Sequence, residues 1–110
     1  MMRPPLSPAA AGLLRGLIAR AGIERERILL SDFRSIDWQS LTFIGERHEI
    51  RLIILPPEAV AAAARITDNL GEAEWRIGGQ IVADVGLTAP TRANPDGSLT
   101  LSLEALTIAE

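Results

Sequence analysis

The chain of 110 residues contains no cysteine and no lysine. The absence of cysteine excludes disulfides, thiol catalysis and cysteine-ligated metals, and it leaves the redox compartment of the protein undecided. The absence of lysine excludes Schiff-base chemistry and the phosphate-binding lysine of a P-loop. All 11 basic residues are therefore arginines, which indicates a GC-rich coding bias of the kind found in many bacteria.

The chain also lacks long apolar runs and an excess of positive charge. No apolar stretch reaches the ~18 residues that a membrane span needs. The stretch Met1–Pro5 has neither the apolar region nor the cleavage site of a signal peptide. The net charge of −3 argues against nucleic acid as the main partner. We therefore expect a cytoplasmic protein that binds neither membranes nor nucleic acid.

The length and composition of the chain indicate one globular domain. A chain of this size buries roughly 60–70% of its unfolded surface, which is enough for one hydrophobic core. Its hydrophobic content of 47% is ordinary for such a core. We expect a single domain over residues 1–110, in which residues 1–6 form a flexible lead-in.

Two segments have the apolar period of amphipathic helices. Ser7 and Pro8 are suited to the N-cap and the first helical position, and the apolar residues that follow predict a helix over 8–21. A second helix is predicted over 57–70, beginning at Pro57 and carrying an alanine-rich stripe.

The stretch 73–88 is predicted to be a strand because its odd positions are all apolar or glycine. It is the longest of the predicted strands. Gly78 and Gly79 in its middle indicate a bend. A hairpin turn is expected at 45–47 and a bulge near Ala105. The other predicted strands are 28–36, 41–44, 48–55 and a final strand from Leu99 onward.

These elements predict an α+β protein with the order α-β-β-β-α-β-β. Short turns between strands favour a mostly antiparallel five-stranded sheet. Two amphipathic helices are expected to cover one face of that sheet, which gives a two-layer sandwich.

His48 is the only histidine, and it suggests the one candidate for catalysis. By parity His48 shares a face with Ile50, and a histidine near Glu46 can act as a general base. Ser40, across the predicted turn, is a candidate hydroxyl. The alternative is that His48 is a hydrogen-bonded structural residue.

No metal or other cofactor is expected. One histidine and no cysteine are too few ligands for zinc. The carboxylates that remain alternate with arginines, and salt-bridged strand faces explain this pattern better than a metal site: Asp32, Asp37, Glu46 and Glu49.

A second group of residues is suited to contact with a ligand or a partner, because tryptophan and arginine dominate interface hot spots. Its members are Trp38, Arg47, Arg51 and Arg76, with Arg34 on the same predicted sheet face. The alternatives are a solvated polar face and a Trp38 that is buried in the core.

The sequence supports two hypotheses on function. The first is a non-enzymatic module that forms a homodimer or binds a protein partner, because several apolar residues break one-sided burial and leave apolar surface on the second sheet face. These residues are Ile53, Leu55, Val82, Leu106 and Ile108. The alternative is a small-molecule-binding protein or a hydrolase-like enzyme with its site around His48. A third hypothesis, nucleic-acid binding through the arginine-bearing face, is disfavoured by the acidic net charge.

Overall fold

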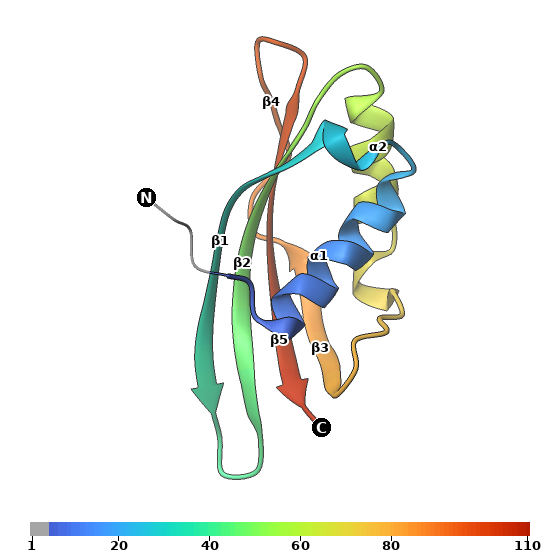
Figure 1. Ribbon diagram of the computed structural model, residues 1–110. Helices are drawn as coiled ribbons and strands as arrows, with labels where there is room; N and C mark the ends of the chain where they lie inside the picture. The colour runs from blue at the N-terminus through green and yellow to red at the C-terminus, as the bar shows by residue number, and fades with distance from the viewer. Residues whose placement is uncertain (1–4) are drawn as a thin grey trace.

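The computed structural model describes residues 5–110 as two helices and a five-stranded sheet (Figure 1). Of the lead-in expected over residues 1–6, residues 1–4 lie outside the described part of the chain. The elements follow the order α1 (Pro8–Ala21), the 3-10 turn η1 (Arg25–Arg27), β1 (Ile28–Gln39), β2 (Ile44–Ile54), α2 (Ala59–Thr67), the 3-10 turn η2 (Leu70–Glu72), β3 (Gln80–Leu87), β4 (Arg92–Ala93) and β5 (Leu99–Ala109).

The sheet is antiparallel and has the strand order β1-β2-β5-β3, with the short β4 paired to the beginning of β5. Both helices lie on one face of the sheet, and the opposite face carries no helix (Figure 1). The predicted α+β class with two layers is confirmed. The element order is α-β-β-α-β-β-β, so the expected order α-β-β-β-α-β-β placed one strand too many before the second helix.

Helix α1 has the bounds that the sequence predicts. The Ser7 hydroxyl accepts a hydrogen bond from the Ala10 amide at 3.1 Å, and Gly22 ends the helix with a φ of 69°. That conformation favours glycine. The core lies between the helices and the sheet, and its most deeply buried aliphatic side chains are Leu13, Leu17, Leu52, Ile54, Ile66, Leu101 and Leu103.

Helix α2 is shorter than the predicted range 57–70. Glu58, just before the helix, has a left-handed backbone with a φ of 67°, and Asp68, just after it, has an extended backbone with a ψ of 121°. Pro57 therefore lies outside the helix. The predicted stripe is nevertheless buried against the sheet: Ala59, Ala63, Ile66 and Leu70.

Three strands were predicted before α2, and the structure has two long strands there. The turn lies at 40–43, not at 45–47, so the predicted strand 41–44 is mostly turn. Gly45 misled the prediction because it is a strand residue, opposite Trp38 on β1 and Ile108 on β5. A Cβ at position 45 would collide with the Thr107 carbonyl oxygen, so close strand approach requires glycine here.

The predicted strand 73–88 begins only at Gln80. Gly78 and Gly79 form a tight turn that is closed by a bridge between Ile77 and Gln80, and Gly79 has a φ of 74°. Before this turn the chain contacts α1, where Trp75 packs against the core. The apolar alternation of 73–77 thus reflects contact with a helix and not pairing in the sheet.

The bulge expected near Ala105 is found on the neighbouring strand. Strand β5 continues without a register shift along β2, and Ala105 and Thr107 are buried on the helix side. The shift lies in β3, between Val82 and Asp84. As a result Val82 is opposite Thr107 and packs against the core, so its expected place on the second sheet face was wrong.

Candidate functional site

His48 lies inside the protein, between β1 and β5. Its side chain is 1% exposed. Nδ1 is 2.8 Å from the Ser35 hydroxyl oxygen and Nε2 is 2.9 Å from the Thr107 hydroxyl oxygen. The Thr107 hydroxyl donates in turn to the Glu46 carbonyl at 3.4 Å. These contacts connect three strands of the sheet through polar groups within an aliphatic layer.

The hydrogen bonds of His48 assign the tautomer of its neutral ring. Because the Thr107 hydroxyl donates to a carbonyl, it accepts the Nε2–H of His48, and Nδ1 accepts the Ser35 hydroxyl hydrogen. Burial lowers the pKa of His48 because the charged form loses solvation, and the nearby Glu46 carboxylate opposes this shift only in part. Burial therefore favours the neutral imidazole, and both ring nitrogens have a hydroxyl partner.

The surroundings of His48 leave little space for a ligand. A space of about 10 Å³ lies beside the ring and is bordered by Leu6, Ala10 and Leu14 on the helix side. One water molecule needs at least that much space. This space is too small for a substrate, and a larger hollow of about 470 Å³ nearby is lined by Ser35 and Glu46 but not by His48.

The other two catalytic candidates are arranged differently from the expected constellation. Glu46 lies on the same strand face as His48 and acts on it electrostatically. Ser40 lies in the β1–β2 turn, where its hydroxyl accepts a hydrogen bond from the Phe43 amide at 3.1 Å. The hydroxyls beside His48 belong instead to Ser35 and Thr107, which only a correct register could have identified.

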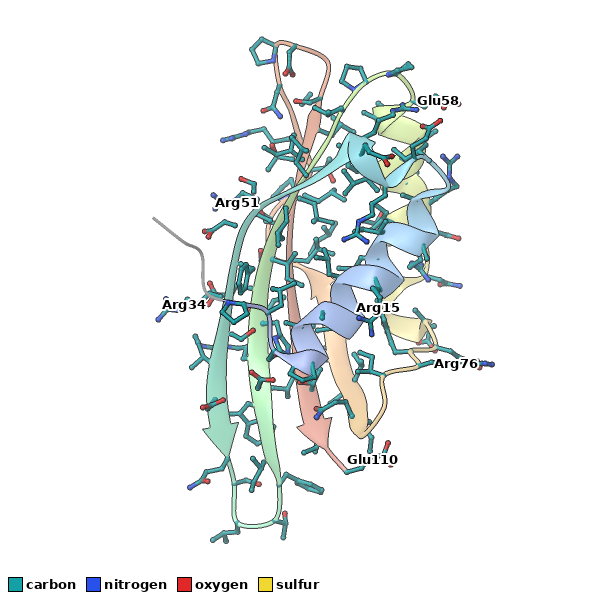
Figure 2. The ribbon with its side chains drawn as sticks, in the orientation of Figure 1. Arg15, Arg34, Arg51, Glu58, Arg76 and Glu110 are labelled. Carbon is teal, nitrogen blue, oxygen red and sulfur yellow. The ribbon has the colours of Figure 1, made fainter. Side chains whose placement is uncertain are left out.

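The face of the sheet without helices carries alternating charges around a hollow of about 430 Å³. Register and side-chain alternation place Arg47 and Arg51 on this face, together with Arg34 from β1. Arg76 is not among them, since it precedes β3 on the helix side of the molecule (Figure 2). The charged residues that line the hollow are Asp32, Arg34, Arg47, Glu49, Arg51 and Glu104.

Next to these charges, the same face becomes apolar towards the β1–β2 turn. Trp38 is half-buried, and its Nε1 lies 2.9 Å from the position that a Cβ of Gly45 would occupy, so the indole covers Gly45. Nε1 is buried and has no hydrogen-bond partner in residues 5–110. The apolar residues that the register places on this part of the face are Ile36, Leu106, Ile108 and, on the far strand β3, Ile81.

The β1–β2 turn is the most exposed apolar segment of the described chain. Residues 40–44, here called the hairpin tip, lie beyond the last residue of β2 that pairs with β5 (Figure 1). The exposed fractions of Leu41, Phe43 and Ile44 are 105%, 51% and 66%. These residues were not among the predicted contact residues, because 41–44 was predicted as a short strand.

Comparisons with protein-family models, with curated proteins and with solved structures find no match for this chain. Residues 5–110 contain no cluster of three or more histidine, aspartate or glutamate side chains arranged to hold a metal ion. Within the same residues, no helix is long and apolar enough to cross a membrane.

Proposed function

We propose that the protein is a non-enzymatic self-association module whose contact surface is the β1–β2 hairpin. The observation that carries this proposal is the hairpin tip, which presents three large apolar side chains to solvent. Burial of each such side chain contributes roughly 1.5–3 kcal/mol. An exposed cluster of this kind on a small domain is typical of an interaction site.

Two further properties of the tip favour a contact surface. Residues 39–45 carry no charge, so their burial requires no ionic desolvation. The turn is held by its own hydrogen bonds, from the Ser40 amide to the Phe43 carbonyl at 2.8 Å and from the Phe43 amide to the Ser40 hydroxyl at 3.1 Å. An ordered tip loses less conformational entropy on binding than a flexible loop.

The hairpin body extends this surface. Trp38 lies at the base of the tip, and Arg34, Arg47 and Arg51 follow on the uncovered face. Tryptophan and arginine are the residues that most often contribute large shares of binding energy at interfaces. This arrangement supports association through the hairpin with a protein surface, and a second copy of the chain is the occupant that we propose.

A small-molecule or hydrolase-like site around His48 has weaker support. A general base has to reach a substrate within hydrogen-bond distance, directly or through one water. Both ring nitrogens of His48 already have protein partners, and the ring is 1% exposed.

The proposal is tested with a double variant of the tip, Leu41→Ser with Phe43→Ser. We expect the dimer dissociation constant, measured by sedimentation velocity, to rise at least about tenfold, because two apolar contacts are lost. The matched control is Val60→Ser, which removes an apolar side chain that is 73% exposed on α2. The proposal would be refuted if the tip variant associated as strongly as the wild type and the control.

A further inference from the structure

The two strands of the hairpin carry opposite charges in matching positions on the uncovered face. Arg34 on β1 is opposite Glu49 on β2, and Asp32 is opposite Arg51. All four residues are exposed. Side chains alternate between sheet faces, and the neighbouring His48 and Ile50 are buried on the helix side, so these four side chains belong to the other face.

These charges are available for contacts outside the chain. Within residues 5–110, ion pairs of 4 Å or less are formed by Arg27 with Glu24 and Glu58, and by none of the four hairpin residues. Arg34 and Arg51 extend away from the sheet on the side opposite the helices (Figure 2). The register thus aligns opposite charges that are not joined to each other within the monomer.

We infer that two copies pack hairpin on hairpin around a two-fold axis that runs parallel to the strands, between β1 and β2. This inference rests on the proposed self-association. The rotation places each β1 over β2 of the other copy. It does not change the level of any residue along the strands, so residues that are opposite each other within one sheet face each other across the dimer. Arg34 then faces Glu49 of the partner subunit, Asp32 faces Arg51 of the partner subunit, and each contact occurs twice, as in any isologous dimer.

Two other two-fold arrangements of the same face bring like charges together. An axis between β2 and β5 places Glu49 over Glu104 of the partner subunit, because these residues are opposite each other in the sheet. An axis perpendicular to the strands at the level of Arg34 places that arginine over its own copy. Like charges in close contact across an interface are strongly unfavourable, so both of these axes are disfavoured. A perpendicular axis midway between Arg34 and Asp32 would pair opposite charges, but it would place the two hairpin tips at opposite ends of the dimer. The charges and the exposed tips together therefore select the axis between β1 and β2.

The same axis also covers the apolar part of the hairpin. Because the axis is parallel to the strands, both hairpin tips lie at the same end of the dimer, where Leu41 and Phe43 contact their copies. Each Trp38 indole covers Gly45 of its own chain and so leans towards the axis, where the two indoles meet. Aromatic pairs of this kind strengthen an interface beyond the area that they bury.

The test uses the full-length variants Arg34→Glu and Glu49→Arg, alone and mixed in equal amounts. In each variant alone, like charges face each other twice across the axis, and we expect the dissociation constant to rise at least about tenfold. In the mixed dimer every facing pair again has opposite charges. We expect the mixture to associate with a dissociation constant within about threefold of the wild type, as measured by sedimentation velocity.

Restored association in the mixture would show that Arg34 and Glu49 pair between two chains and not within one chain. In each variant, positions 34 and 49 of the same hairpin carry charges of the same sign, and mixing with another protein does not change this. Thermal unfolding of each variant monitors the fold, and Asp32→Arg mixed with Arg51→Asp provides a second, independent pair. If the wild type associates and neither mixture is rescued, the proposed axis is wrong and hairpin-mediated association stands. If the wild type is a monomer at every concentration, both proposals are wrong.

Discussion

His48 is a buried residue whose two ring nitrogens both have protein partners. Its ring connects Ser35 on β1 with Thr107 on β5 through hydrogen bonds of 2.8 and 2.9 Å. A buried polar group is tolerated when its hydrogen bonds are made, and it then fixes one register of the strands that it joins. Parity in the sequence correctly placed His48 with Ile50 on the buried face.

Burial of His48 predicts a pH-dependent stability. The folded protein has a lower His48 pKa than the unfolded chain, whose value is near 6.5. As the pH falls below 6.5, the unfolded chain binds a proton first, so the free energy of unfolding decreases until the pH passes the pKa of the folded state. We expect this loss in urea unfolding curves of the wild type measured between pH 7.5 and pH 5.

The variant His48→Gln isolates this effect. Its amide can replace the donor to Thr107 but leaves Ser35 without its partner, so we expect a loss of about 1–3 kcal/mol at pH 7.5. The decrease of stability between pH 7.5 and pH 5 should be smaller in the variant, because it lacks the titrating ring. An equal pH dependence in both proteins would show that His48 does not titrate in the expected direction.

Among the elements, α1 and the segment before β3 are joined by an unusually close contact. Cβ atoms built at Gly12 and Gly16 would lie 2.8 Å from the Ile77 side chain and 2.6 Å from the Trp75 ring. The two glycines are one helical turn apart, so they form a flat strip on α1. Trp75 and Ile77 occupy this strip and attach the segment 73–77 to the helix.

The substitution Gly16→Ala tests this contact. An alanine in an exposed helix interior would stabilise the protein by about 0.5–1 kcal/mol relative to glycine. At position 16 we expect instead a destabilisation of about 1–3 kcal/mol, because the new methyl group overlaps the Trp75 ring. The same substitution in a Trp75→Leu background should be neutral or stabilising. If Gly16→Ala raised the melting temperature of the otherwise wild-type chain, the close contact would be refuted.

The sequence predicted element types better than it predicted where elements end. Helix α1 has clear signals at both ends, and its range was correct. The hairpin was misplaced because Gly45 and the charged residues after it resemble a turn, whereas the actual turn contains Leu41 and Phe43. Periodicity reports alternation of apolar residues, and it does not distinguish burial in the core from exposure at a projecting tip.

The same limit applies to the candidate site. The register places Trp38, Arg47 and Arg51 on one face of the sheet, and their role in contact with a ligand or partner stays a prediction. The position of Arg76 outside the sheet could not be predicted without knowing that β3 begins only at Gln80. The charge pairs of the hairpin depend on the β1–β2 register, which follows from the position of the turn.

The whole molecule is asymmetric, and this asymmetry is the basis of the proposed function. Both helices cover one face of the sheet, while the other face and the hairpin tip remain open (Figure 1). The interface proposed for the hairpin covers only part of one sheet face, which is typical of weak, reversible association. A dimer of this type forms when the local concentration is high.

The most direct measurement is the native mass of the wild-type protein by light scattering across a dilution series. The series should extend from about 1 μM to about 1 mM, the range over which a weak dimer assembles. Association through the hairpin predicts a mass that rises with concentration from the monomer value of 11.8 kDa towards twice that value. A mass of 11.8 kDa at every concentration would contradict the proposed self-association.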